Sequence, residues 1–442
     1  MAFDFENLEA QIKERGSMET LENGATLITE NIPGSGLVKA RLAMHVGSDY
    51  EEPEEYGTLH FLEHMAFNGS RLYPDRFKRN VEAGAVGLGL NARTGNTMVT
   101  FPVGGKDDGY MLPKNFVQGF RMMSDMAFFP LLTEELLQKE RDIIQRERVE
   151  GEINLSKDKE KGNRKEVEQR LYSSNPLLLK ENILCVGTSE SISNMSLEKL
   201  REFHSKYFVG KNTLARVIGD LNGNGSKSPL VDMAKEMLME VPAGEMSPPI
   251  EYAEEKPFQG KETIIQKSDF PQNKEVLMYF NVPSFQYKES YALNPLKFIL
   301  GGDFNGMLFN DLREEKQLVY SLGCGTMGHM KTGYFFIHYT VESEKLDLAM
   351  KATESCLSKV KQGLFDEKSM EAFRAAYIPM ALEDFQKPRW IEKELRERYD
   401  QERFGYQSTS LERLKGIFNV TKQDVVEAAN KYLGENRLVV IK

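Results

Sequence analysis

The sequence predicts an α+β protein made of two homologous modules, each a mostly antiparallel sheet flanked by helices. Three observations support this fold class. The chain contains an internal repeat, its strand-like segments alternate as in a sheet with one buried face, and a single aperiodic stretch separates the two copies. With 442 residues the chain is long enough for several domains, each of about 50–200 residues.

Four segments of the first half recur in the second half. In chain order the pairs are 38–48 with 273–284, 60–69 with 297–306, 196–208 with 421–433, and 214–220 with 437–442. The third pair reads as an N-capped amphipathic helix that ends in Lys-Tyr, and the fourth as the strand that follows it. Two further segments, "VTFPV" (99–103) and "GYFFIHYTVE" (333–342), alternate apolar and polar residues as antiparallel strands do.

The boundary between the modules is expected in the stretch 241–260, which is rich in proline and glycine and has no periodicity. We therefore expect an N-terminal domain at 1–243, a linker at 244–260 and a C-terminal homologous domain at 261–442.

Composition narrows the class of protein. The net charge of -10 argues against a nucleic-acid-binding surface. The three cysteines are far apart and form no CxxC, which favours a reducing compartment. The N-terminus resembles neither a secretory signal nor a transit peptide, and no apolar run is long enough to cross a bilayer. We expect a cytoplasmic protein without membrane insertion.

The segment "LHFLEHMAFNGS" (59–70) places three polar residues, His60, Glu63 and His64, in an apolar stretch. The second copy has Lys297, Leu300 and Gly301 at these positions, so the scaffold itself does not require the polar trio.

In a helix, two histidines four residues apart project from one face and can bind one metal ion. Glu63 lies beside them, where it can accept a proton from a water on the metal without binding the metal itself. This is the inverted form, HxxEH, of the HExxH zinc-peptidase pattern. The alternative is a tolerated polar patch, because histidine pairs at this spacing also occur by chance.

A third ligand is expected from the helix predicted at 133–150. Leu137, Glu140, Ile144 and Glu147 lie on one face of it, so two carboxylates occupy positions where apolar residues belong. Either Glu140 or Glu147 could complete a metal site with the histidines, and the other could orient a histidine. The alternative is that both glutamates pair with neighbouring arginines.

Together these segments resemble the pitrilysin-type (inverzincin) zinc metallopeptidases. The resemblance rests on "HFLEHMAFNG", "ERDIIQRE" (140–147), "NARTGNTMVTF" (91–101) and "LREEKQLVYS" (312–321), and it covers nearly the whole chain. It implies a zinc endopeptidase with one Zn²⁺ per chain, with His60, His64 and Glu147 as ligands, Glu63 as general base and Glu140 in an outer shell.

The resemblance also implies how peptide substrates are bound. Asn91 and Ala92 begin the edge strand that pairs with substrate backbone, and Arg313 and Tyr320 bind substrate and stabilise the oxyanion.

The chain has half the length of the long pitrilysin type, which implies half of a clamshell that closes around a chamber. Because this chain has both the zinc motif and the Arg/Tyr segment, we expect a homodimer, with a heterodimer as the alternative. The rival function is a catalytically silent scaffold or partner subunit of a related protease or respiratory complex.

Overall fold

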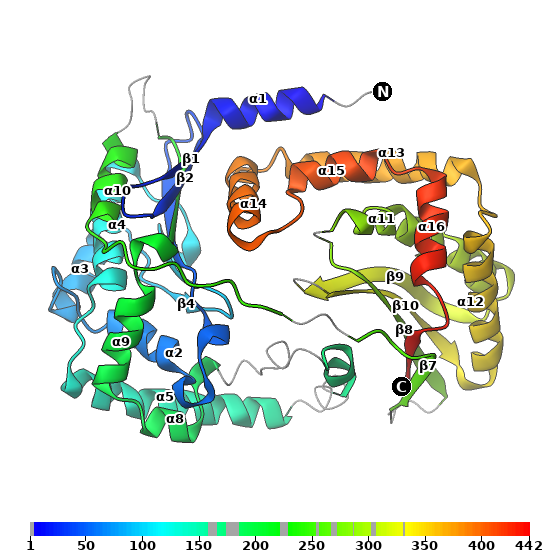
Figure 1. The fold of residues 1–442 in the computed structure, drawn as a ribbon, viewed down its shortest axis with the longest axis horizontal. Coiled ribbons are helices and arrows are strands. Elements are labelled where there is room, and N and C mark those ends of the chain that lie inside the picture. Colours follow the sequence, from blue (N-terminus) through cyan, green and yellow to red (C-terminus); the bar gives the residue numbers. More distant parts are fainter. Residues whose placement is uncertain are drawn as a thin grey trace. The chain divides into compact units, whose positions relative to one another are not determined.

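A computed structural model describes residues 4–157, 166–173, 185–221, 229–252, 256–266, 272–285, 287–301, 306–329 and 332–442. The chain divides into two compact units (Figure 1). Unit 1 consists of Met1–Asp158, Lys180–Ile250 and Pro388–Arg396, and unit 2 of Lys159–Leu179, Glu251–Lys387 and Glu397–Lys442.

Unit 1 contains a six-stranded sheet in the order β1-β2-β6-β3-β5-β4. Its strands are β1 (Gly16–Thr20), β2 (Thr26–Asn31), β3 (Val38–Met44), β4 (Arg93–Thr94), β5 (Val99–Val103) and β6 (Thr213–Gly219). β2 and β6 are parallel, and the other neighbours are antiparallel. The short strand β4 is therefore an edge of this sheet.

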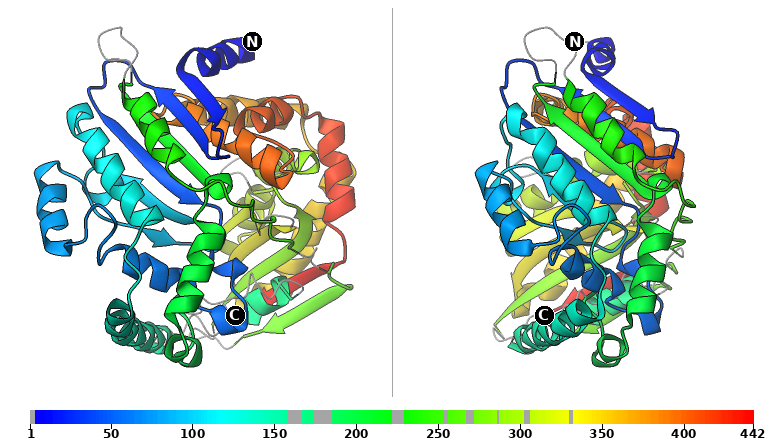
Figure 2. Two further views of the ribbon diagram at one scale, coloured as in Figure 1. Left: turned by 60° about the vertical axis from the view of Figure 1, so that its left-hand side comes forward. Right: turned by 90° about the vertical axis from the view of Figure 1, so that its left-hand side faces the viewer.

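The helices of unit 1 pack on this sheet and on one another (Figure 2). They are α1 (Phe5–Arg15), α2 (Thr58–Ala66), α3 (Arg76–Ala85), α4 (Pro113–Phe128), α5 (Glu134–Lys157), α8 (Ser189–Ser193), α9 (Leu197–Tyr207) and α10 (Pro229–Met239). α4 lies against β3 and β5, and α2 contacts β4, α5 and α9. Buried residues such as Leu42 and Phe101 of the strands and Leu62 and Phe120 of the helices form one core.

Unit 2 contains a five-stranded sheet in the order β7-β11-β8-β10-β9. Its strands are β7 (Lys261–Ile265), β8 (Asn273–Pro283), β9 (Val319–His329), β10 (Thr332–Glu342) and β11 (Arg437–Ile441). β7 and β11 are parallel and the rest antiparallel, as in the series β2-β6-β3-β5-β4 of unit 1. This shared order confirms the prediction of two homologous modules, and β1 is an addition to the first.

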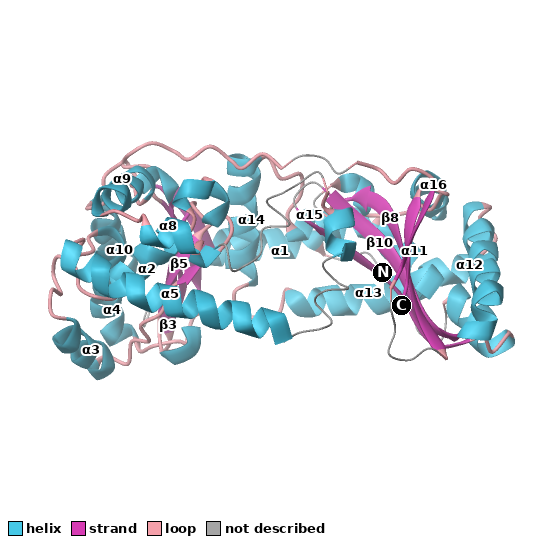
Figure 3. Ribbon diagram, turned by 90° about the horizontal axis from the view of Figure 1, so that it is seen from below, coloured by secondary structure: helices cyan, strands magenta, loops and turns pink. Residues whose placement is uncertain are grey.

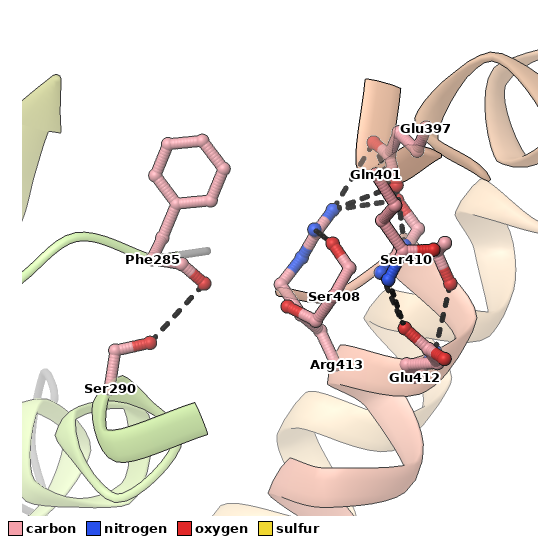
Figure 4. A network of polar contacts seen from close by, with 9 residues as sticks. Phe285, Ser290, Glu397, Gln401, Ser408, Ser410, Glu412 and Arg413 are labelled. Atoms are coloured by element: carbon pink, nitrogen blue, oxygen red, sulfur yellow. Dashed lines mark hydrogen bonds and ion pairs between the residues drawn. The ribbon is translucent and has the colours of Figure 1, made fainter. Parts of the chain in front are cut away.

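The helices of unit 2 are α11 (Leu293–Gly301), a π-helical segment at Phe309–Glu315, α12 (Leu346–Lys361), α13 (Glu367–Asp384), α15 (Ser410–Phe418) and α16 (Lys422–Tyr432), together with the second part of α14 (Trp390–Phe404). Glu397 of α14 fixes the start of α15, because its carboxylate accepts the Ser410 backbone N–H and pairs with Arg413 at 3.1 Å (Figure 4). The Arg413 guanidinium also donates to the Ser408 carbonyl. Among the described helices of the whole chain, none is long and apolar enough to cross a membrane.

Two segments depart from the contiguous boundaries expected at 243 and 261. Pro388–Arg396 belongs to unit 1, where Glu392 forms a buried ion pair with Arg216 and donates its backbone N–H to Glu30. Lys159–Leu179 belongs to unit 2, where Arg170 pairs with Glu262. Each of these partners lies at least 90 positions away in sequence, so local composition could not reveal the exchange.

Candidate metal centre

Helix α2 is fixed at its N-terminus by a buried carboxylate. Gly57, the residue before the helix, has φ 88°, and an added Cβ would lie 2.5 Å from the Val186 carbonyl oxygen, so glycine is required there. The Glu51 carboxylate accepts the Gly57 N–H at 3.1 Å and the Leu59 N–H at 2.8 Å. An anion at this end also complements the helix dipole.

One face of α2 is apolar and fully covered. Leu59, Phe61, Leu62 and Met65 have at most 2% of their surface exposed. The three polar side chains of His60, Glu63 and His64 are half-buried and lie on the other side of the helix. Packing of the apolar face therefore determines where the three polar side chains point.

Helix α5 lies beside α2 (Figure 3). Leu137 and Ile144 are fully buried and Glu140 is 3% exposed, whereas the Glu147 side chain keeps 44% of its surface. The helix begins after Thr133, whose hydroxyl accepts the Leu136 N–H at 3.4 Å. The buried face anchors α5 and leaves Glu147 accessible beside the histidines.

Three donor atoms converge between the two helices. Glu147 Oε2 lies 3.6 Å from His60 Nε2 and 3.5 Å from His64 Nε2, and the ligand atoms of all three residues lie within 4.8 Å of one another. Ligand atoms at about 2.0–2.1 Å from one tetrahedral zinc are about 3.3 Å apart. The two distances to Glu147 are close to this value, so the two histidines and Glu147 can hold one zinc ion after side-chain adjustment, and these are ligand types that zinc accepts.

Glu140 lies on the opposite side of the His64 ring. Its Oε2 is 2.8 Å from His64 Nδ1, and its Oε1 accepts a hydrogen bond of 2.9 Å from Asn68 Nδ2. Asn68 also donates to the His64 carbonyl at 3.0 Å. This arrangement leaves His64 Nε2 to face Glu147, which is how a carboxylate orients a metal-binding imidazole.

Glu63 is held from the edge strand β4. The Thr94 hydroxyl donates a hydrogen bond of 2.7 Å to Glu63 Oε2. Glu63 therefore points towards β4, next to the three converging side chains but not among them.

The pKa values of three groups, His60, His64 and Glu63, are shifted in different ways. Burial, with a contribution from His64, lowers the pKa of His60 to about 4, so this imidazole is neutral at pH 7. Burial alone would lower the pKa of His64, but the hydrogen bond to Glu140 and the Glu147 charge raise it overall. Burial raises the pKa of Glu63, and the Thr94 hydrogen bond opposes this. The Glu63 carboxylate is therefore more basic than an exposed glutamate, which suits a group that takes up a proton.

Glu140 and Glu147 face histidines rather than the neighbouring arginines. Burial would raise the pKa of Glu140, but hydrogen bonds from His64 and Asn68 outweigh it and the pKa is lowered. His60 Nδ1 is buried, and no hydrogen-bond partner is found for it among the described residues. The two rings therefore differ at Nδ1, which faces a carboxylate in His64 and has no hydrogen-bond partner among the described residues in His60.

The expected substrate-binding residues lie in two places. Asn91 is exposed and Ala92 buried, and both directly precede the edge strand β4. Arg313 and Tyr320 belong to unit 2, on the π-helical segment and at the start of the edge strand β9. Tyr320 is 81% exposed, and the Arg313 guanidinium carbon lies 5.6 Å from its ring centroid.

Sequence patterns alone missed three residues of this region. Glu51, Asn68 and Thr94 each hold part of α2 or α5 by a hydrogen bond from a loop or strand. Asn68 lies just beyond the end of α2 at Ala66, and its spacing of four positions from His64 was the one available signal.

Comparison with known proteins places the chain in a family. Residues 26–178 match the model of "Insulinase (Peptidase family M16)", and residues 194–377 match that of "Peptidase M16 inactive domain". The chain belongs to peptidase family M16. A protein of Rickettsia felis named "Uncharacterized zinc protease" is 25% identical over 427 residues, 95% of each chain.

Solved structures agree with this M16 fold. The first half of the periplasmic protease PqqL from Escherichia coli has a TM-score of 0.75 at 16% identity, covering 97% of this chain and 92% of that one. The ferredoxin protease FusC, solved as an E83A mutant with Arabidopsis ferredoxin, has a TM-score of 0.69 at 18% identity. The match covers 96% of this chain and 47% of the FusC chain. At these identities the likeness concerns the fold alone.

Proposed function

We propose that this M16 chain is a zinc-dependent endopeptidase. The observation that carries the proposal is the convergence of His60, His64 and Glu147 beside Glu63, in a geometry that fits one zinc ion per chain. The similarity to proteins named zinc proteases supports both the metal and the reaction class.

Each residue of the centre has a role that follows from its position. His60, His64 and Glu147 hold the zinc, and Glu140 and Asn68 hold His64 in the orientation that presents Nε2. Zinc, when bound, supplies Lewis acidity that lowers the pKa of a water molecule and polarises the scissile carbonyl. Glu63 accepts the proton of the attacking water and passes it to the leaving amine, so the peptide is cleaved without a covalent intermediate.

The substrates proposed are peptides or unfolded segments that enter an enclosed chamber. An extended substrate can add to the edge of the sheet beside Asn91 and Ala92 through main-chain hydrogen bonds. Tyr320 is exposed and the Arg313 side chain is partly exposed, and the two lie beside each other, so both are accessible to bind substrate and stabilise the oxyanion. The structure of FusC with ferredoxin shows that one solved relative engages a protein.

We further propose that the chain works as a homodimer in the cytoplasm, with a heterodimer as the alternative. The presence of both the HxxEH segment and the Arg/Tyr segment in one chain supports two equivalent subunits.

The rival is a catalytically silent scaffold. The match to a model described as an inactive domain covers residues 194–377, which are the last part of the first module and much of the second. This stretch contains no HxxEH. The complete donor set in unit 1 favours the enzyme over the scaffold.

Two measurements test the proposed function. Metal analysis is expected to give one zinc per chain, lost in His64→Ala and retained in Glu63→Gln, while Glu63→Gln abolishes cleavage of a diverse peptide mixture. Glu150→Gln is the matched control, because Glu150 is an exposed glutamate on the same helix α5. It should keep both zinc and activity. A folded, zinc-loaded wild type that cleaves no peptide would favour the scaffold.

A further inference from the structure

The hydroxyl of Thr94 is placed to control the orientation of Glu63. Thr94 Oγ1 lies 2.7 Å from Glu63 Oε2, and the described residues offer no other side-chain hydrogen bond to this carboxylate. An ionised carboxylate only accepts hydrogen bonds, so the threonine is the donor. The bond occupies Oε2, and the Thr94 backbone N–H gives the same carboxylate a further hydrogen bond. In the described part of the chain, no side chain donates to Oε1.

The backbone holds the Thr94 hydroxyl firmly. Thr94 is the last residue of β4 and is paired with Val99 of β5, and β-branched side chains have few χ1 rotamers. The side chain is half-buried, so the hydroxyl has little freedom to turn towards water. The position of the strand therefore sets the position of the carboxylate oxygen.

We propose that Thr94 is a positioning residue for catalysis, which fixes the Glu63 carboxylate so that its second oxygen faces the water to be deprotonated. The inference rests on the proposed function, in which Glu63 is the general base. The short edge strand β4 then has two roles. Its backbone edge receives the substrate, and its Thr94 side chain orients the base.

This double role links substrate binding to the chemistry. A substrate strand that pairs beside β4 restrains the backbone of Thr94, and the hydroxyl transmits that restraint to Glu63. Loss of the hydroxyl should therefore lower kcat while the edge itself still binds peptide, because the main-chain groups of β4 are unchanged.

The test compares Thr94→Val, which removes only the hydroxyl, with Thr94→Ser, which keeps it. Thr94→Val is expected to lower kcat about 10- to 100-fold, the usual effect of an outer-shell partner, with KM and zinc content changed less than about twofold. Thr94→Ser should restore most of kcat. The matched control is Thr100→Val on the neighbouring strand β5, opposite Arg93, which should leave kcat unchanged.

A second readout does not depend on activity. Crystal structures of the zinc-free wild type and of Thr94→Val should differ at Glu63. Its carboxylate should be hydrogen-bonded to the Thr94 hydroxyl in the wild type and displaced from that position in the variant. An unmoved carboxylate, a Thr94→Val enzyme with wild-type kcat, or a Thr94→Ser enzyme as impaired as Thr94→Val would each overturn the inference. An inactive wild type would instead defeat the proposed function, and the crystal structures would still decide whether Thr94 positions Glu63.

Discussion

Replacing Glu140 by glutamine should weaken zinc binding although Glu140 is not placed as a ligand. In the wild type, Oε2 accepts from His64 Nδ1–H and Oε1 accepts from Asn68 Nδ2–H, at 2.8 and 2.9 Å. Glutamine has one acceptor oxygen and one NH₂ group. If its oxygen faces His64, its NH₂ group meets the Asn68 amide donor, and if it faces Asn68, His64 loses its acceptor.

The expected loss of zinc affinity follows from this lost hydrogen bond. Glu140 is 3% exposed, so water does not easily replace the missing partner. Losing an outer-shell acceptor on a ligating histidine typically costs 10- to 100-fold in metal affinity, or about 1.4–2.8 kcal/mol. The Kd for zinc of Glu140→Gln should therefore rise about 10- to 100-fold.

The assay is competition for zinc against a chromophoric chelator of known affinity at pH 7.5, with Glu150→Gln as the control of equal charge change on the same helix. Glu150→Gln should bind zinc as the wild type does. A Glu140→Gln protein whose zinc Kd stays within about twofold of wild type would refute the view that Glu140 orients His64.

Three further predictions concern stability and assembly. Arg216→Met should lower the free energy of unfolding by about 3–5 kcal/mol, because it removes the partner at 2.6 Å from Glu392, which is 3% exposed, and leaves only Arg389 at 3.9 Å. Lys235→Met breaks the exposed pair with Glu19 and should cost under about 1 kcal/mol. Equal losses in denaturant titrations would contradict this prediction. Burial lowers the pKa of His204 to about 4 from an ordinary value of 6.5, so its contribution to stability is complete above pH 6.5 and is lost as the pH falls towards 4. Between pH 6.5 and 5 the wild type should lose about 2 kcal/mol more than His204→Gln in urea unfolding, and parallel pH profiles would show that the buried ring does not titrate in this way. Light scattering should give a mass near twice 50.4 kDa, and a monodisperse monomer with full peptidase activity would rule out the homodimer.

The sequence predicted the elements on which the site is built because packing made them periodic. The apolar side chains around His60 and His64 indicated the helix now seen at Thr58–Ala66, and Leu137 and Ile144 indicated the buried face of α5. The polar residues were noticeable because they interrupted those patterns. Glu140 and Glu147 stood out together, but periodicity could not say which of them lies at which side of an imidazole, since that depends on the packing of α2 against α5.

The residues that the sequence could not predict act across long separations without any periodic pattern. Thr94 reaches Glu63 across 31 positions, and Asn68 reaches Glu140 across 72. The docking of Pro388–Arg396 in unit 1 depends on Glu30, 362 positions from Glu392. Such polar contacts are set by the tertiary arrangement, and the partners Thr94, Asn68 and Glu30 interrupt no apolar pattern in their own segments.

The second module explains why the metal centre belongs to one copy of the repeat only. Gly301 stands at the position of His64, and a Cβ added there would lie 2.5 Å from Cys324 Sγ and 2.7 Å from the Cys324 backbone nitrogen. Contacts below 3.0 Å are not tolerated, so the edge strand β9 closes the space that an imidazole would need. In the first module the corresponding edge strand is β4. It leaves room for the Glu63 side chain of α2, which it contacts through the Thr94 hydroxyl. The difference between the modules is therefore more than the loss of three polar side chains. The strand beside the helix leaves room for a reaction centre in one module and fills that room with packing in the other.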